Sequence, residues 1–354
     1  MTPLPVAVDA MGGDYGPSVV VEGAVAAWRD LAISSILVGS ESELRKLLAA
    51  NGIAPVPLGQ AGISIQHAAE FITMEESPSV VIRGKADSSI RVALDLVAAR
   101  KASAVISPGN TGAVMVASLF VLGTVPGIVR PAIASAIPRA SDARPTVLLD
   151  SGATVDCPSS QLVQFAIMGS AYATALTGVE PPRVAVLSNG SEPGKGNDVT
   201  RAAAEVLRSL PGIKFVGYVE GRDIPTTASD VVVCDGFVGN IALKCMEGSA
   251  ALVLDSIKHA VKDTVRGKIG MLLLKPTLRK LFRERLSPSA YGGAPLLGLN
   301  GLVIICHGSA KARAITNAIR TAHKFSADRL VESITERLVN FAARGGGAES
   351  AGRV

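Results

Sequence analysis

Residues 104–112 read AVISPGNTG, and this stretch contains the pattern that predicts the fold. Ala104–Ser107 is an apolar run of strand length, and Gly109-Asn110-Thr111-Gly112 follows it as a glycine-rich loop that opens a helix. A buried strand that passes through a short loop into a helix is the repeating unit of α/β proteins. The stretch therefore predicts an α/β unit whose loop lies at the carboxyl end of a strand.

The same order of strand, loop and helix recurs along the chain. Helical periodicity fills several gaps between apolar runs, at residues 88–100, 160–176 and 200–210. Strands that alternate with helices form right-handed crossovers, so the predicted fold class is α/β, three-layered, with a largely parallel sheet. The other apolar runs are Val6–Val8, Ser35–Val38, Thr146–Leu149, Arg183–Leu187, Lys214–Val219, Val231–Cys234 and Leu302–Cys306.

The composition favours a globular enzyme and excludes several other classes. Hydrophobic residues make up 48% of the 354 residues and aromatic residues only 4%, which suits a Val, Ile, Leu and Ala core in a parallel sheet. The net charge of +5 favours an anionic substrate or acidic partner, and no basic cluster interleaved with aromatics predicts nucleic-acid binding. The four cysteines stand far apart, and no signal peptide or membrane-length apolar stretch is visible, so we expect a reduced, cytoplasmic protein.

The loops after the strands are expected to hold the ligand, because parallel α/β sheets bind ligands beyond the carboxyl ends of their strands. In residues 109–112, backbone N–H groups and the helix dipole would face an anion, although a tight turn with an N-cap gives the same pattern. Lys85 is a further candidate cation, or part of a solvated helix start. The loop from Asn189 to Asn197 places Lys195 among glycines, which is typical of a phosphate contact and equally of a surface turn.

A second group of candidates follows two later apolar runs. Asp235 is a candidate proton acceptor, Asn240 a candidate oxyanion donor, and Lys244 a candidate anion ligand one helical turn further on. The alternative for Asp235 is a helix cap. His307 and Ser309 supply an imidazole and a hydroxyl, for which a structural role is the alternative.

Common catalytic and cofactor motifs are absent from the sequence. Residues 190–196 resemble a P-loop, but the spacing is one residue short and the Ser or Thr is missing. The sequence contains no GxGxxG after the first strand, no GxSxG and no HExxH, and its four histidines are scattered. We therefore expect neither a metal nor an organic cofactor.

Taken together, these strings resemble the PlsX family, the acyl-[acyl-carrier-protein]:phosphate acyltransferases of bacterial phospholipid synthesis. The resemblance covers most of the chain. This sequence departs from the usual family pattern in two places. Ser107-Pro108 precedes GNTG here, where the family usually has Ser-Ala. Ser188 and residues 191–193 differ from the usual loop near Asn189. The strings that carry the resemblance are VAVDAMGGD (6–14), GNTG (109–112), LDSGA (149–153), KGN (195–197), EGRDI (220–224), CDGFVGN (234–240), YGGAPLLG (291–298) and HGS (307–309).

The resemblance also implies an architecture and partners. It implies an isocitrate/isopropylmalate dehydrogenase-like fold, in which residues 1–340 form one enzyme unit of two lobes around a cleft. The glycine-rich residues 341–354 are expected to be a disordered tail. The family further implies a homodimer, peripheral membrane association and a membrane glycerol-3-phosphate acyltransferase that consumes the product.

The reaction implied is transfer of a long-chain acyl group from acidic acyl carrier protein to inorganic phosphate, which gives an acyl phosphate and a free thiol. Phosphate is itself a nucleophile, so the protein must hold it, stabilise the oxyanion and protonate the thiolate. By likeness to phosphotransacetylases, Asp235, Asn240 and Lys244 are the expected catalytic residues. The residues expected to bind phosphate or substrate are Lys85, Gly109, Asn110, Thr111, Gly112, Asn189, Lys195, Asn197, Gly239, His307 and Ser309.

Three other functions are alternatives to this one. A short-chain phosphotransacetylase would use coenzyme A, and the sequence offers no nucleotide-recognition region. A decarboxylating hydroxyacid dehydrogenase should carry clustered Asp ligands for a divalent metal and a set of substrate-binding arginines, which are missing. A non-catalytic scaffold at the membrane would not need so many polar strand-end loops.

A basic amphipathic tip is predicted at about residues 262–290. Leu278, Leu281, Phe282 and Leu286 fall at helical spacing after Pro276, which is expected to start a helix. Basic residues flank this stripe, so the segment is expected to contact anionic lipid headgroups. The alternatives are an apolar dimer or core helix, or a surface that meets acyl carrier protein.

Overall fold

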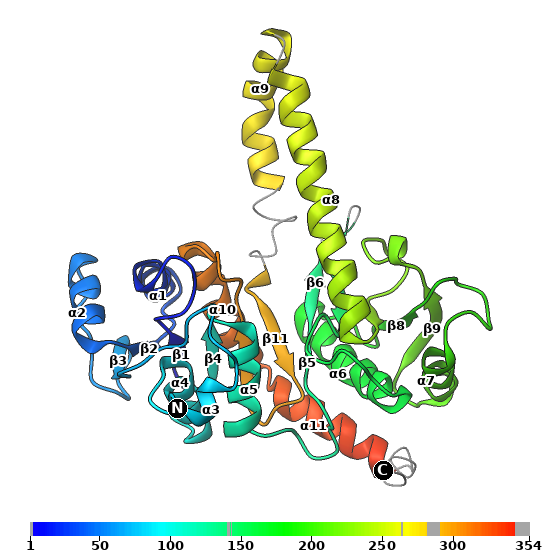
Figure 1. Cartoon of the computed structure of the whole chain (residues 1–354), viewed down its shortest axis with the longest axis horizontal. Helices are drawn as coiled ribbons and strands as arrows, with labels where there is room; N and C mark the ends of the chain where they lie inside the picture. Colours follow the sequence, from blue (N-terminus) through cyan, green and yellow to red (C-terminus); the bar gives the residue numbers. More distant parts are fainter. Residues whose placement is uncertain (1–2, 140–141, 143, 263–264, 282–290, 344–354) are drawn as a thin grey trace.

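The computed structural model describes residues 3–139, 142, 144–262, 265–281 and 291–343. Within these residues the chain forms an α/β fold with two sheets, one of seven strands and one of five. Figure 1 shows the two sheets side by side, each with its own helices, and two long helices that project away from them. The tail predicted at 341–354 lies outside the described residues from residue 344 onward.

The seven-stranded half contains the strand predicted at residues 104–107. Its strands are β1 (Val6–Asp9), β2 (Ser35–Gly39), β3 (Ile63–His67), β4 (Ala104–Ser107), β5 (Ala132–Ile133), β11 (Ala294–Leu297) and β12 (Leu302–Ile305). Its helices are α1 (Pro17–Leu31), α2 (Glu41–Ala50), α3 (Val80–Arg83), α4 (Ser89–Ala98), α5 (Thr111–Val121) and α10 (Ala312–Ala327). The sheet order is β3-β2-β1-β4-β12-β11-β5.

Both faces of this sheet are covered, which explains the continuous apolar runs in the sequence. Val6 and Val8 of β1 belong to a core that includes α1 and α10. Ala7, between them, faces a separate core with α4 and α5. Strands β3, β2, β1, β4 and β12 are parallel, as predicted, because helices return the chain to the same end of the sheet each time.

The five-stranded half has the order β6-β7-β10-β8-β9. Its strands are β6 (Ser135–Ile137), β7 (Thr146–Leu149), β8 (Arg183–Leu187), β9 (Lys214–Val219) and β10 (Val231–Val233). Helices α6 (Ser159–Thr177), α7 (Asp198–Ser209) and α11 (Leu330–Phe341) share one core with it, and the start of α8 (Gly236–Lys262) packs on its other face. A 3-10 turn, η1 (Gly221–Asp223), follows β9.

The two halves are joined by continuous packing. Strands β5 and β6 are separated by a single residue, so the chain passes directly from one sheet to the other. Tyr172 of α6 meets Phe325 of α10 edge to face, with ring centroids 5.3 Å apart and both side chains buried. One hydrophobic core therefore extends across both halves.

The prediction of one largely parallel sheet needs correction. The structure has two sheets, and β5, β6 and β11 pair antiparallel with their neighbours. Strands β5 and β6 have two and three residues, too few to show a periodicity, and Pro295 lies within β11. These are the segments that carry the chain between the sheets.

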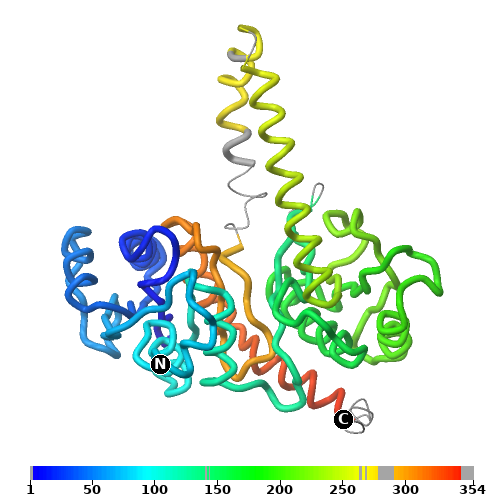
Figure 2. The backbone as a smooth tube through the Cα atoms, in the orientation of Figure 1, coloured from blue at the N-terminus to red at the C-terminus, as the bar shows by residue number. Residues whose placement is uncertain are grey.

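Helices α8 and α9 (Val265–Leu281) form a hairpin that projects from the body (Figure 2). Apolar side chains lie exposed along it, including Leu252 at 67%, Leu272 at 69% and Leu273 at 75% exposure. Among the described residues, α8 is the one helix long and apolar enough to cross a membrane by length and composition. Of its most apolar stretch, 6% is buried in the structure. The hairpin thus presents an apolar surface that the other residues described by the structure leave uncovered.

The predicted start of the tip helix at Pro276 is wrong. Pro276 lies inside α9, which begins at Val265. The Met and Leu residues at 271–274 are strong helix formers, and they extend the helix through a position where proline removes one backbone hydrogen bond. Leu278 and Leu281 lie in the last turns of α9, whereas Phe282 and Leu286 lie outside the described residues.

Candidate active site

Three strand-end loops converge in the seven-stranded half. They follow β1, β4 and β12, which are neighbours in the sheet. Ser107 Oγ donates a hydrogen bond to Asp9 Oδ2 at 2.6 Å, which ties the first two loops together. The backbone N–H of Asp14 donates to Gly308 O at 2.9 Å, which ties the first loop to the third. These contacts build one continuous surface from residues far apart in the sequence.

Asp9 is the buried centre of this cluster. Burial raises the pKa of its carboxyl group, and hydrogen bonds from Ser107 and nearby groups oppose that shift. A methyl group on Gly12 would lie 2.8 Å from Cα of Gly109 and 3.0 Å from Asp9 Oδ2, so only glycine allows the two loops to approach this closely. Asp9 and Ser107 therefore set the position of the glycine-rich loop.

The first turn of α5 supplies the N–H groups predicted to bind an anion. Asn110 is its N-cap, with Oδ1 accepting from Ala113 N at 3.1 Å, so the cap alternative holds for this side chain. Thr111 and Gly112 begin the helix, and N–H groups in a first turn have no acceptor inside the helix. The side chain of Asn110 therefore caps the helix, and the N–H groups of Thr111 and Gly112 have no acceptor within it.

Lys85 is not a free cation. Its Nζ lies 2.7 Å from Glu76 Oε1 in an ion pair and donates to Phe71 O at 2.9 Å.

Ser309 lies next to His307, with Ser309 N and Oγ 3.2 Å and 2.8 Å from His307 Nδ1. These two side chains are exposed at the third loop, where the sequence placed them.

The equivalent centre of the five-stranded half is Asp150, at the end of β7. Its carboxylate accepts backbone N–H groups from Ile133, Gly152, Ala153 and Thr154 at 2.7–3.1 Å. Burial raises the pKa of the carboxyl group against the effect of these hydrogen bonds. Because Ile133 belongs to the other half, Asp150 also fixes one half against the other.

The start of α8 packs closely on the loop of residues 150–154. A Cβ on Gly239 would collide with the carbonyl oxygen of Asp150, and a Cβ on Gly236 would lie 2.5 Å from Asp150 Oδ2. Gly236 N donates to Thr154 O at 2.8 Å. Gly239 is thus required by packing, and this packing delivers the next residue, Asn240, to the loop.

The three predicted catalytic residues lie together at the start of α8. Asp235 Oδ1 accepts from Val238 N at 2.8 Å, so Asp235 caps the helix, and it is partly exposed. The exposed Asn240 side chain lies 3.7 Å from the position of a Cβ on Gly152. Lys244 Nζ forms an exposed ion pair with Glu247 at 2.9 Å. The cap holds Asp235 Oδ1 in place. The other carboxylate oxygen, Oδ2, accepts no hydrogen bond from the described residues.

The loop after β8 contains an unpaired cation. Asn189 Oδ1 accepts from Gly196 N at 2.9 Å, which closes the loop. Asn197 caps α7, with its Oδ1 accepting from Thr200 N at 2.9 Å. Lys195 is exposed, and no ion pair holds its ammonium group within the described part of the chain. Asn189 and Asn197 are therefore structural supports of the loop, and Lys195 is its available charge.

Three buried cysteines lie at or near these loops. Burial raises the pKa of the Cys157 and Cys306 thiols to about 12 and that of Cys234 well above its usual value, so these thiols are poor nucleophiles. Within the described ranges, no group of three or more His, Cys, Asp or Glu could hold a metal ion. A cavity of about 310 Å³ lies elsewhere, between Ile167, Leu210 and the end of α11.

Sequence reasoning missed Asp9, Ser107 and Asp150 as members of the site. Asp9 and Asp150 each come directly after an apolar strand run, so both stand at the carboxyl end of a buried strand. An acid in that position is the signal that could have identified them. It does not reveal the partner, since Ser107 is far from Asp9 in sequence.

Comparison with known proteins identifies the family. A family model described as "Fatty acid synthesis protein" matches residues 4–332. A phosphate acyltransferase of Pelotomaculum thermopropionicum is 46% identical over 344 residues, which are 97% of this chain and 98% of that protein. The chain belongs to the PlsX family of phosphate acyltransferases. A second relative, the phosphate acyltransferase of Geotalea daltonii, is 46% identical over 333 residues and 94% of each chain.

The enzyme class predicted from the sequence is thereby confirmed as an acyltransferase, and its reaction is an acyl transfer that involves phosphate. Solved structures share the α/β fold. A phosphotransacetylase from Streptococcus pyogenes covers 92% of this chain and 94% of its own, with 18% identity and a TM-score of 0.60. A 4-hydroxythreonine-4-phosphate dehydrogenase from Klebsiella pneumoniae covers 91% of this chain and 99% of its own, with 14% identity and a TM-score of 0.55.

Proposed function

We propose that this acyltransferase moves a long-chain fatty acyl group from acyl carrier protein to inorganic phosphate, producing an acyl phosphate for phospholipid synthesis. The observation that carries the proposal is the pair of strand-end loops, one in each half. The loop after β4 offers the N–H groups of Thr111 and Gly112, and the loop after β8 offers Lys195, which has no ion pair among the described residues. Such groups suit a phosphate dianion. The net charge of +5 suits an acidic carrier protein.

In the proposed mechanism, phosphate is the nucleophile. An oxygen of hydrogen phosphate attacks the thioester carbonyl carbon, the new C–O bond forms and the C–S bond breaks. The proton of the hydrogen phosphate passes to the departing thiolate. Asn240 donates a hydrogen bond to the oxyanion, and Asp235 transfers the proton through its uncapped oxygen. Lys244 can leave Glu247 for an anion at little cost, because exposed ion pairs contribute only about 0–1 kcal/mol.

The proposal also covers the shape of the enzyme. Residues 1–340 act as one unit of two lobes, with the two strand-end surfaces facing a cleft as in isocitrate/isopropylmalate dehydrogenase-like folds. Asp150 supports this arrangement, because it accepts hydrogen bonds from both halves at the base of the site. Lys85, Asn110, Asn189 and Asn197 then position the phosphate-binding backbone instead of touching phosphate.

We propose that the hairpin of α8 and α9 contacts a membrane surface. At that surface a homodimer would pass the acyl phosphate to a membrane glycerol-3-phosphate acyltransferase. The support is the exposed apolar surface of α9 and the basic residues Lys262, Arg266 and Lys275 beside it. Replacing Leu272 and Leu273 with Glu should abolish co-flotation with anionic liposomes and leave turnover of a soluble donor unchanged. Unchanged flotation, or loss of a dimer, would contradict this assignment.

One assay tests the proposed reaction. The enzyme is incubated with palmitoyl-acyl carrier protein, and separately with acetyl-CoA, with and without phosphate, while free thiol is measured. We expect phosphate-dependent thiol release from the carrier protein donor. Release from acetyl-CoA alone would instead indicate a short-chain phosphotransacetylase.

A further inference from the structure

Residues 70–78, which we name the strap, lie against the anion-binding turn of α5. Asn110 Nδ2 donates to Met74 O at 3.1 Å and to Glu76 O at 3.2 Å. A Cβ on Gly112 would lie 2.7 Å from Pro78 Cγ. The strap leads into α3, which packs beside α5 (Figure 1). It therefore forms one side of the site around Thr111 and Gly112.

The polar groups of the strap hold it in place. Lys85 binds both the carbonyl oxygen of Phe71 and the carboxylate of Glu76. The same carboxylate accepts from Thr73 N at 2.8 Å. The hydrogen bond from Lys85 lowers the pKa of Glu76, which keeps the carboxylate charged and the clamp intact. The backbone of the strap is thus fixed by these polar contacts and by Ile72, whose side chain is buried in the core.

Two other apolar side chains of the strap point away from the core. Phe71 is 44% exposed and Met74 is 43% exposed. Met74 Cε lies 3.1 Å from the position of a Cβ on Gly308, whose carbonyl oxygen accepts from Asp14 N. Met74 therefore stands where the loops after β1 and β12 meet, at the rim of the anion-binding surface. An exposed Phe and Met held rigidly beside a polar site favour an apolar ligand there.

We propose that Phe71 and Met74 bind the methylene groups of the acyl chain beyond its fourth carbon, so that the strap sets the preference for long over short acyl donors. This inference rests on the proposed phosphorolysis of a thioester. The thioester carbonyl must lie about 3–3.5 Å from a phosphate oxygen, so the acyl chain leaves the site across the rim that these residues occupy. A flexible methionine packs well against a chain without fixed shape, and each buried methylene adds roughly fourfold in affinity.

The test compares donors that differ only in chain length. Phe71→Ser and Met74→Ser are assayed with butyryl, octanoyl and palmitoyl thioesters of the same carrier protein. We expect kcat/KM for palmitoyl to fall about 10-fold in each variant, kcat/KM for butyryl to change less than about twofold, and the phosphate KM to stay the same. Leu58→Ser is the matched control, because Leu58 is 48% exposed and precedes β3, at the opposite end of that strand from the strap.

Each other result has a defined meaning. Equal losses for butyryl and palmitoyl donors would show that the strap contacts the carrier protein or the phosphate, and would overturn the inference. The same loss in Leu58→Ser would overturn it as well. If the wild-type enzyme released thiol without any dependence on phosphate, the proposed function itself would fail, which is a separate observation from the chain-length profile.

Discussion

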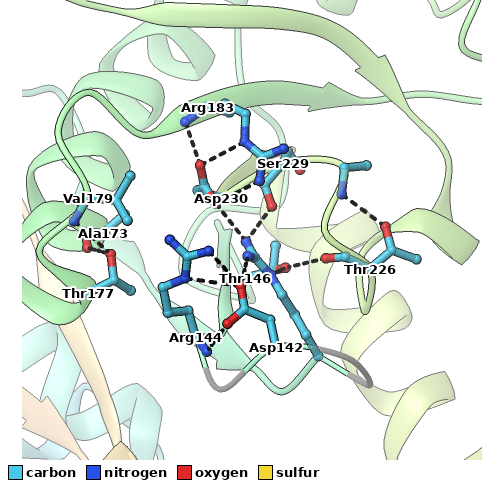
Figure 3. A network of polar contacts seen from close by, with 12 residues as sticks. Asp142, Arg144, Thr146, Ala173, Thr177, Val179, Arg183, Thr226, Ser229 and Asp230 are labelled. Carbon is cyan, nitrogen blue, oxygen red and sulfur yellow. Dashed lines mark hydrogen bonds and ion pairs between the residues drawn. The ribbon is translucent and has the colours of Figure 1, made fainter.

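The two edges of the five-stranded sheet are built in opposite ways. At the edge where β7, β8 and β10 begin, charged side chains pair with one another (Figure 3). Buried Arg139 donates from Nε to Thr146 Oγ1 at 2.9 Å and from Nη2 to Asp230 Oδ1 at 3.0 Å. Arg183 donates to the other oxygen of Asp230 at 3.1 Å, and Ser229 O also accepts from Arg139. This edge is closed by its own contacts.

At the edge where the same strands end, polar side chains stabilise the loops, and some of their charged groups remain free to contact a ligand. Asp235 uses one oxygen to cap α8, and Asn189 closes its loop through a single backbone bond. The cation of Lys195 remains unpaired within the described residues. Ion pairs that stabilise the fold lie at one end of this sheet, and the proposed ligand site lies at the other, as expected where ligands bind beyond the carboxyl ends of strands. Substitutions at the two edges should therefore have different consequences.

The largest effect is expected at the closed edge. Arg139→Ala should lower the free energy of unfolding by about 3–5 kcal/mol, because it leaves the buried Asp230 carboxylate without one of its partners. Turnover per folded molecule should stay near the wild-type value. Urea unfolding followed by circular dichroism measures the loss. Arg144→Ala is the control, since its side chain is 49% exposed and its removal should cost less than about 1 kcal/mol; equal losses in both variants would refute the comparison.

The next effect is expected at the open edge. Asp235→Asn should reduce kcat by roughly 10²-fold, because it removes the group proposed to transfer the proton. Stability should change little, since Asn caps a helix about as well as Asp. Steady-state kinetics together with a thermal melt separate the two effects. Wild-type turnover in folded Asp235→Asn would reduce this residue to a cap.

The closed edge should also respond to acid. Burial opposes ionisation of Asp230, but hydrogen bonds from Arg183 and Arg139 outweigh it and lower the pKa of this carboxyl from 3.8 to about 2. The depressed pKa stabilises the fold by about 2 kcal/mol above pH 3.8, and this contribution is lost as the pH falls from 3.8 towards 2. The difference in unfolding free energy between wild type and Asp230→Asn should therefore shrink as the pH is lowered through that window. A difference that stays constant would show that the ion pairs contribute nothing through this carboxylate.

The smallest effect is expected from the free cation. Lys195→Ala should raise the phosphate KM roughly 5–10-fold and leave kcat unchanged, because it removes a contact made equally in the ground state and the transition state. Lys214 is the matched control, an exposed lysine at the first residue of β9 and so at the other edge of the same sheet. Kinetics with varied phosphate should show no change for Lys214→Ala. An equal shift in both variants would mean that only the overall charge matters.

Local patterns in the sequence predicted much of the fold. The runs at β4, β7, β8 and β9 have the same bounds in the structure. Buried strands between loops leave an uninterrupted apolar run, as at β4 and β7, whereas only the last two residues of β9 are buried. The two-residue β5 is too short to leave such an apolar run in the sequence, although it is the strand that turns the chain towards the second sheet. Pro276 misled the prediction of α9, since a local rule about proline cannot weigh the helix formers before it.

The candidate site could be predicted only in part. The structure places most candidate residues in loops that follow strands, as the sequence predicted, because polar residues follow the strand runs directly. The hydrogen-bond partners of their side chains could not be predicted, because those partners lie far away in sequence. Asn110 caps α5 while it binds the strap, and Lys85 is engaged by Glu76 instead of a ligand. Choosing between capping and binding required the three-dimensional contacts.

The central claim is that phosphate, held by the loops at the carboxyl ends of the strands, is the acceptor of the acyl group. The most direct measurement is to trap the product of palmitoyl-acyl carrier protein and phosphate with hydroxylamine, and to compare the hydroxamate formed with the thiol released. We predict equal amounts of both, only when phosphate is present, and a common fall in both for Asp235→Asn. Thiol release without phosphate, or without hydroxamate, would show that water or another group accepts the acyl chain and would contradict the account.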